Sequence, residues 1–144
     1  MVICSDGSRL GDAVLPAAAR WGSDLELAPW LVEVIGPDES VSEIDEPRRD
    51  LQAEMAVARL GRLSESLVGR CGAAEVQALH GADPARSIVA FGTRLPASLI
   101  AMVTHGRAGF GRLSLGSITA NVVRQATCPV LVIKPPVGSS STAK

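Results

Sequence analysis

The chain has 144 residues, of which 47% are hydrophobic and 20% charged, and its net charge is -1. This length fits one domain with a sizeable core, and the composition excludes an intrinsically disordered protein. The near balance of charge, together with only two Phe, two Trp and no Tyr, argues against a nucleic-acid-binding platform, which needs a basic surface and stacking aromatic rings.

Apolar residues at helix or strand spacing divide the first half of the chain into elements. From Leu10 to Trp21 they fall on one helix face, with a kink expected at Pro16 and a stop at Gly22. The buried stripe of the next helix is expected at Ala53, Ala56, Val57, Leu60, Ser64 and Leu67. The predicted elements are a strand over 1–5, a helix over 10–21, a strand over 30–35, a loop over 40–47 and a helix over 48–68.

Shorter elements follow in the second half. Asp83 and Pro84 are typical of a helix start, because Asp caps a helix and Pro suits its first position. Residues 99–103 are nearly all apolar, as in a strand that is covered on both faces. The predicted elements are a strand over 74–79, a helix from 84 to about 92, a strand over 99–103, a helix over 117–126, a strand over 130–133 and a disordered tail over 137–144.

This alternation of strands and helices predicts an α/β fold, with a parallel sheet and helices on both of its faces. The chain has no internal repeat and no linker that would divide residues 1–136. In such sheets, ligands bind beyond the carboxyl ends of the strands, where the strand order reverses. The turns that follow the first and fourth strands are therefore the places to look for a site.

The turn from Thr104 to Ser117 is the strongest candidate, since it ends at a helix start. Free backbone N–H groups and a partial positive charge at that start favour a phosphate. Ser117 would either cap the helix or donate its hydroxyl to a phosphate oxygen. No Lys follows the glycines as a Walker loop requires, and their spacing is not that of a dinucleotide fingerprint. A plain flexible loop is the alternative. The glycines are Gly106, Gly109, Gly111 and Gly116.

The other turn, 5–8, contains Asp6 at the end of the first strand. Its carboxylate would accept hydrogen bonds either from a ribose hydroxyl or from adjacent backbone N–H groups.

Taken together, these segments resemble the universal stress protein family over residues 2–134. The nucleotide-binding branch of that family carries Gly-x-x-Gly, nine residues, and then Gly-Ser or Gly-Thr. Here Gly106 is followed by the nine residues 107–115 and then by Gly116 and Ser117. Val103 departs from the pattern, because it replaces the first glycine and would either crowd the nucleotide or cover the ribose. The matching flanks are Asp6-Gly7-Ser8, Gly81-Ala82-Asp83-Pro84, Thr104-His105-Gly106-Arg107 and Cys128-Pro129-Val130-Leu131-Val132.

The resemblance implies a Rossmann-like domain of the adenine nucleotide alpha hydrolase type, with strand order 3-2-1-4-5. It implies that Asp6 lies toward the ribose, that the backbone at Val34 reads adenine, and that backbone N–H groups cradle the phosphates. The last strand, 130–133, would lie at a sheet edge and pair with its copy in a homodimer. The implied nucleotide-binding residues are Ser5, Asp6, Val34, Met102, Val103, Gly106, Arg107, Gly116, Ser117, Ile118 and Thr119.

The function that we expect is an ATP-binding, dimeric stress-response regulator, with Mg²⁺ or Mn²⁺ as an open question. The chain has only two histidines, His80 and His105, and no acidic cluster near the glycines. Both observations argue against efficient phosphoryl transfer, which needs a held metal and a residue that orients the nucleophile. A slow ATPase is one alternative. Another is a dimeric interaction module that binds no nucleotide, which Val103 would favour.

A cytoplasmic location is expected from the three cysteines, Cys4, Cys71 and Cys128. They are far apart and form no Cys-x-x-Cys pair, which is typical of reduced thiols. No signal peptide is visible, and no apolar run approaches the ~20 residues of a membrane span. The sequence leaves open whether another copy of the domain precedes Met1.

Overall fold

The computed structural model describes residues 1–36, 46–96, 98–104 and 115–134. Its centre is a five-stranded parallel sheet with the strand order β3-β2-β1-β4-β5, as predicted. Gly106, Arg107 and the predicted tail lie outside the described residues. The strands are β1 (Val2–Ser5), β2 (Trp30–Ile35), β3 (Glu75–His80), β4 (Ile100–Val103) and β5 (Val130–Ile133).

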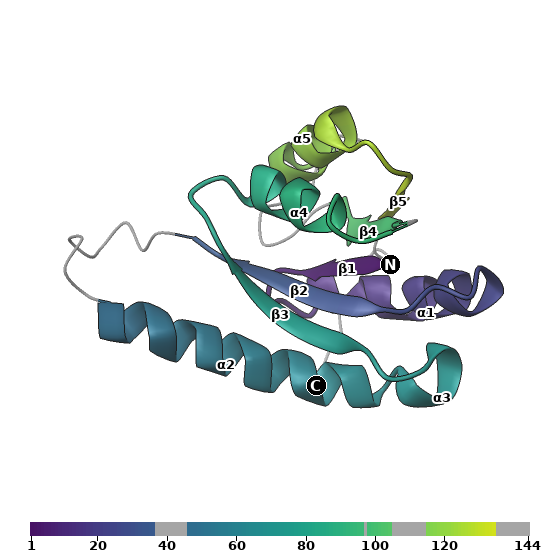
Figure 1. The fold of residues 1–144 in the computed structure, drawn as a ribbon, viewed down its shortest axis with the longest axis horizontal. Helices are drawn as coiled ribbons and strands as arrows, with labels where there is room; N and C mark the ends of the chain where they lie inside the picture. Colours follow the sequence, from purple (N-terminus) through teal and green to yellow (C-terminus); the bar gives the residue numbers. More distant parts are fainter. Residues whose placement is uncertain (37–45, 97, 105–114, 135–144) are drawn as a thin grey trace, which may run out of the picture.

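Helices cover both faces of the sheet (Figure 1). On one face lie α1 and α2, and on the other lie α4 and α5, so the molecule has three layers. As predicted, Asp83 caps α4, since its carboxylate accepts a hydrogen bond from the amide of Arg86 at 3.1 Å. The helices are the 3-10 helix η1 (Gly11–Val14), α1 (Leu15–Asp24), α2 (Glu46–Glu65), α3 (Val68–Cys71), α4 (Pro84–Gly92) and α5 (Ser117–Gln125).

The sheet separates two hydrophobic cores, because successive side chains of a strand point to opposite faces. From β1, Ile3 packs into the core under α1 and α2, whereas Val2 packs into the core under α4 and α5. At the end of β4, Val103 belongs to the first core and Met102 to the second. This alternation decides which side chains of the strand ends face the site described below.

The structure corrects the expected helix over 10–21. It begins as the 3-10 turn η1, and α1 starts only at Leu15, so that Pro16 occupies the first turn and makes no kink. The helix also continues past Gly22, where a Cβ would lie 2.7 Å from Cε of Met1. Gly22 therefore allows close packing rather than ending the helix. Trp21, placed on the inner face from its spacing, is 46% exposed.

The prediction of one long helix over 48–68 is only partly correct. It starts earlier, at Glu46, and ends at Glu65, after which α3 forms a separate turn. Leu60 and Leu67 are buried as predicted, but Val57 is 39% exposed. Leu67 lies beyond the end of α2, at the N-cap of α3, so the period of a single helix does not describe the whole expected stripe. Among the described residues, no helix has the length and apolarity that crossing a membrane requires.

Candidate functional site

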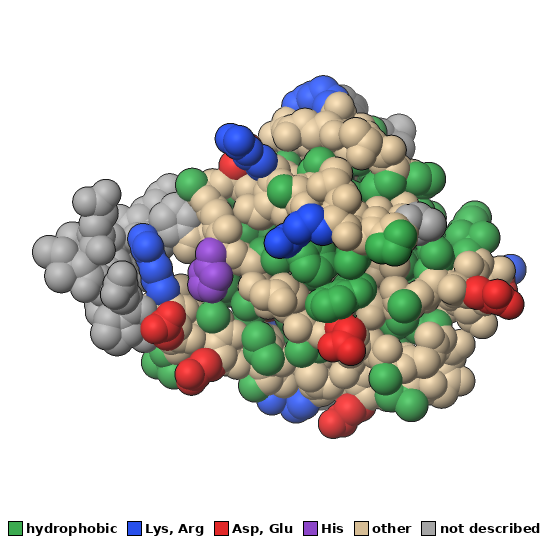
Figure 2. Space-filling model, viewed as in Figure 1, with side chains coloured by type: hydrophobic (Ala, Val, Ile, Leu, Met, Phe, Trp, Pro, Cys, Tyr) green, Lys and Arg blue, Asp and Glu red, His purple; other side chains and the backbone are tan. Residues whose placement is uncertain are grey.

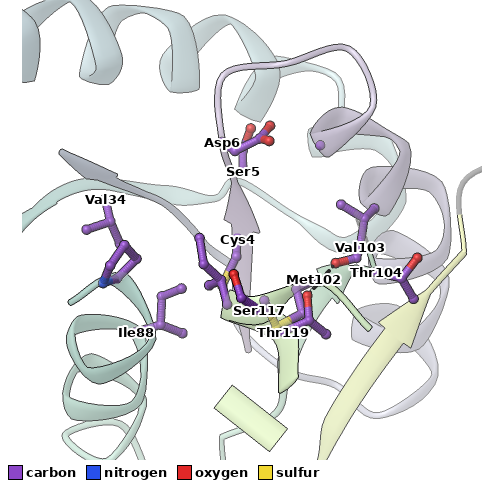
Figure 3. Close-up of a pocket in the computed structure, with 14 residues that line it drawn as sticks. Cys4, Ser5, Asp6, Val34, Ile88, Met102, Val103, Thr104, Ser117 and Thr119 are labelled. Atoms are coloured by element: carbon purple, nitrogen blue, oxygen red, sulfur yellow. Dashed lines mark hydrogen bonds between the residues drawn. The ribbon is translucent and has the colours of Figure 1, made fainter. Parts of the chain in front are cut away.

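A pocket of about 390 Å³ lies at the carboxyl ends of β1 and β4, beside the start of α5. This is where the strand order reverses, since β1 is flanked by β2 on one side and β4 on the other. All the predicted site residues that the structure describes line it (Figure 3). The lining residues are Cys4, Ser5, Asp6, Gly11, Val34, Pro84, Ile88, Met102, Val103, Thr104, Gly116, Ser117, Ile118 and Thr119.

Sequence reasoning missed one wall of this pocket. Pro84 and Ile88 come from the first turns of α4, and Cys4 comes from β1. In the sequence, Cys4 and Ile88 resemble ordinary core residues, and Pro84 indicates a helix start rather than a pocket wall. Pro84 and Ile88 reach the pocket because β3 leads into α4, whose first turns lie at the strand ends.

The part of the pocket under α4 is apolar. Cys4, Val34, Ile88 and Met102 line it, and Cys4 and Met102 are 8% and 5% exposed. Burial raises the pKa of Cys4 to about 12, so its thiol stays protonated at neutral pH and serves as a wall rather than a nucleophile. Such a slot suits a flat, weakly polar ring.

The turn after β1 forms a polar rim. The Asp6 carboxylate oxygen Oδ1 accepts hydrogen bonds from the amide of Ser8 at 2.9 Å and from its hydroxyl at 2.5 Å. A Cβ on Gly11 would lie 2.3 Å from the same oxygen, so any other residue there would displace the Asp6 carboxylate. Of the two roles considered for Asp6, the structure therefore shows the bond to an adjacent N–H group. A bond to a ribose hydroxyl stays a prediction.

Ser5 contributes its backbone rather than its hydroxyl. The hydroxyl donates to Oδ1 of Asp12 at 3.0 Å and accepts from the amide of Gly7 at 3.3 Å and from Nη2 of Arg59 at 3.2 Å. Gly7 lies in the β1–η1 turn, Asp12 lies on η1 and Arg59 lies on α2. The hydroxyl is thus engaged inside the protein.

The start of α5 forms the third part of the pocket. Gly116, not Ser117, is the N-cap residue, and no side chain caps the helix, so the capping role considered for Ser117 is wrong. The amide of Gly116 donates to the carbonyl of Thr104 at 2.7 Å and is already used. The first amides of a helix have no intrahelical acceptor, and Ser117, Ile118 and Thr119, which carry such amides, line the pocket.

Val103 does not fill the gap between α5 and the β1 turn. Its side chain packs in the core with Val14, Leu15 and Ala18, and Figure 3 shows it pointing toward the η1 side. Its carbonyl accepts a hydrogen bond from the hydroxyl of Thr119 at 2.9 Å, drawn as a dashed line. The backbone at this position thus ties β4 to α5, and the valine side chain leaves the pocket open.

Charges are mixed on the face that Figure 2 shows, where Lys, Arg, Asp and Glu side chains are scattered among apolar ones. Inside the pocket, the charged side chain among the described lining residues is Asp6.

The family model of the universal stress proteins matches residues 1–134. The chain belongs to this family. Among curated relatives, a universal stress protein of Methanocaldococcus jannaschii, MJ0531, is 47% identical over 53 residues. A universal stress protein of Mycolicibacterium smegmatis is 44% identical over 39 residues. The aligned segments span 37% and 27% of this chain, but only 31% and 13% of the relatives' own lengths.

Several solved structures share the fold of this chain. The structure of the hypothetical protein MJ0577 superposes with a TM-score of 0.82 at 23% identity, over 95% of this chain and 96% of its own. A universal stress protein from Archaeoglobus fulgidus in complex with dAMP has a TM-score of 0.66 at 18% identity, over 92% and 95% of the two chains. Another, solved in complex with cAMP, has a TM-score of 0.66 at 21% identity, over 94% and 95%.

Proposed function

We propose that this domain binds an adenine nucleotide, ATP in the cell, and acts as a regulatory protein of the stress response. The observation that carries the proposal is one pocket that joins an apolar slot to the amides at the start of α5. Its volume of about 390 Å³ falls within the roughly 300–1,000 Å³ of small-molecule sites. The dAMP and cAMP held by two relatives support adenine as the base.

The backbone of Val34 supports the placing of the base. In a parallel strand, the polar backbone groups of alternate residues point to the same neighbour. The amide of Trp30 donates to Met1 on the β1 side, whereas the carbonyl of Ile35 accepts from Gly81 on the β3 side. Val34 therefore points its backbone groups toward β1, one residue beyond the last register pair, Ser5 with Glu33. This places them at the pocket, where they suit the edge of adenine.

The phosphates would lie at α5. The amides of Ser117, Ile118 and Thr119 point away from the helix, and the hydroxyl of Ser117 is exposed at the same end. Asp6 lines the pocket at the end of β1, and we expect its carboxylate to meet a ribose between base and phosphates. Mg²⁺ or Mn²⁺ would accompany the phosphates as part of the bound nucleotide.

We infer a sensor rather than an efficient enzyme. Phosphoryl transfer needs a held metal and a residue that orients the nucleophile. Asp6 is the single carboxylate among the described lining residues, and its Oδ1 is engaged by Ser8. Binding that favours one conformation is enough for a sensor, because ligands shift populations without chemistry. A cytoplasmic location, suggested by the reduced cysteines, belongs to the same proposal.

A homodimer through β5 completes the proposal. β5 pairs with β4 on one side and ends the described sheet on the other. The carbonyls of Pro129 and Ile133 accept from β4, so the backbone groups of Val130 and Val132 point to the open edge. Val132→Pro removes an outward N–H and spares the pairing with β4. Sedimentation should show a dimer for the unmodified protein and a folded monomer for the variant, and a dimer in both would contradict this interface.

Titration calorimetry with ATP, AMP and GTP tests nucleotide binding directly, together with native mass spectrometry for a copurified nucleotide. Gly116→Val should weaken ATP binding at least tenfold, ~1.4 kcal/mol, by blocking phosphate approach. The fold should survive, because φ -54° and ψ 152° at this position suit any residue. Ser117→Ala should weaken binding less, and Ser23→Ala, an exposed serine on α1 outside the pocket, serves as the control.

Two results would redirect the assignment. If millimolar ATP produces neither binding heat nor a rise in Tm, the interaction-module alternative replaces the nucleotide sensor. If the protein consumes ATP steadily and Ser117→Ala abolishes this, the slow-ATPase alternative replaces it.

A further inference from the structure

We infer that Arg59 is a positioning residue that holds the pocket-lining turn after β1 in place and so sets nucleotide affinity, without touching the nucleotide. The inference rests on the proposed function. It deepens it by connecting the pocket to α2, on the opposite face of the sheet (Figure 1).

One guanidinium joins three other elements. Its Nη2 donates to the hydroxyl of Ser5 on β1 at 3.2 Å and to a carboxylate oxygen of Glu33 on β2. Its Nη1 donates to Oδ1 of Asp12 on η1 at 3.4 Å. The same Asp12 oxygen accepts from the Ser5 hydroxyl. The four side chains form a single network directly beneath the turn.

The network requires a cation. Ser5 and Glu33 are register partners on adjacent strands, so their side chains lie on the same face, toward α2. Asp12 brings a second carboxylate to the same hydroxyl, and the side chains of Glu33 and Asp12 are only 16% and 28% exposed. Two carboxylates largely removed from water repel each other unless a positive group lies between them. Arg59, itself 23% exposed, is that group.

The turn rests tightly on this network. The amide of Gly7, a residue with φ +76°, donates to the Ser5 hydroxyl. A Cβ on Gly7 would lie 3.1 Å from Oε1 of Glu33, so there is no slack between the turn and that carboxylate. On its other side, the turn presents Asp6 and Gly11 to the pocket. A displacement of Glu33 or Asp12 is therefore passed to the rim of the nucleotide site.

The test compares variants of α2 in the full chain. Arg59→Met keeps the length of the side chain and removes its charge. We expect ATP affinity to fall about fivefold or more, which is the lower end of coupling between separate sites. In the nucleotide-free protein, hydrogen exchange over residues 5–14 should rise. Arg59→Lys keeps the charge, so its ATP affinity and its hydrogen exchange over residues 5–14 should lie between those of the unmodified protein and Arg59→Met. If Arg59→Met does not fold, Arg59→Lys replaces it in the comparison.

Three controls separate positioning from general destabilisation. Arg62→Met, an exposed arginine on the same helix, should change neither readout. Leu60→Val, in the core beside Arg59, should lower Tm without changing ATP affinity. Glu33→Gln added to Arg59→Met should recover affinity, because it removes one of the two repelling charges, whereas a packing role alone predicts a further loss.

The outcomes for the inference and for the proposed function are distinct. Unchanged exchange over 5–14 together with unchanged ATP affinity in Arg59→Met overturns the role of Arg59 and leaves the proposed function standing. Equal affinity losses in Arg59→Met and Leu60→Val overturn it as well. If the unmodified protein binds no ATP, the proposed function itself is wrong. This titration is done before any variant is compared.

Discussion

Replacing Val103 by glycine, the residue found there in the nucleotide-binding branch of the family, should destabilise the domain without improving the site. The side chain is 8% exposed and packs in the core with Val14 and Leu15, so Val103 borders the pocket without filling it. Its removal would therefore leave a gap in the core beneath η1 and would add no space for a ligand.

The size of the effect follows from burial. Losing three buried carbons at ~0.8 kcal/mol each, with about 0.5–1 kcal/mol for glycine in a strand, gives a loss of roughly 3 kcal/mol in the free energy of unfolding. For a domain of this size, at roughly 2–4 °C per kcal/mol, Tm should fall by about 10 °C. ATP affinity should stay within about threefold, since a change below ~0.7 kcal/mol is expected for a side chain that packs in the core and does not fill the pocket.

Calorimetric Tm values and ATP titrations of Val103→Gly and Val2→Gly check this together. Val2, on β1, is fully buried in the core on the other face of the sheet from Val103. It is therefore a matched control for the loss of stability. A tenfold gain in ATP affinity specific to Val103→Gly would show that the valine obstructs the site. A negligible change in Tm would refute the packing argument.

Three further predictions concern single contacts. Thr119→Val leaves the carbonyl of Val103 without its donor and should cost about 1–3 kcal/mol in urea unfolding; an unchanged midpoint would contradict a bond of any consequence. Asp83→Ala removes the cap of α4 and should cost about 1 kcal/mol, whereas Ser23→Ala should leave Tm unchanged. Burial raises the pKa of Cys4 to about 12, while an unfolded thiol titrates near roughly 8.5. The folded state thus holds the proton more tightly, so this contribution to stability is complete below about pH 8.5 and declines as pH rises toward 12. Cys4→Ala should flatten the loss of unfolding free energy between about pH 8 and pH 10; parallel curves for the two proteins would count against it.

Local patterns predicted the strands better than the helix faces. Residues 130–133 were identified by a short apolar run, and the strand has those bounds. Helical spacing placed Trp21 and Val57 inside, yet both are substantially exposed. The reason is that a helix buries only the part of its apolar stripe that a neighbour covers, and the neighbour is chosen by the tertiary arrangement.

Glycine shows the same division between local and tertiary causes. The sequence assigned Gly22 a stop signal, whereas its role is to let Met1 approach α1. Gly11 was given no role, although a side chain there would collide with Asp6. The role of Gly22 depends on Met1, which is distant in the chain, and the role of Gly11 depends on Asp6, which lies across a turn. Patterns of neighbouring residues do not predict either contact.

By itself, the sequence determined the alternation of strands and helices, the family, and the strand ends at which to look for a site, because these depend on spacing along the chain. The tertiary structure alone decided how the described residues at those strand ends are engaged. The amide of Gly116 donates to the carbonyl of Thr104, the hydroxyl of Ser5 accepts a hydrogen bond from Arg59, and the side chain of Val103 packs beneath η1. These outcomes depend on hydrogen bonds and packing between elements that only the folded sheet brings together.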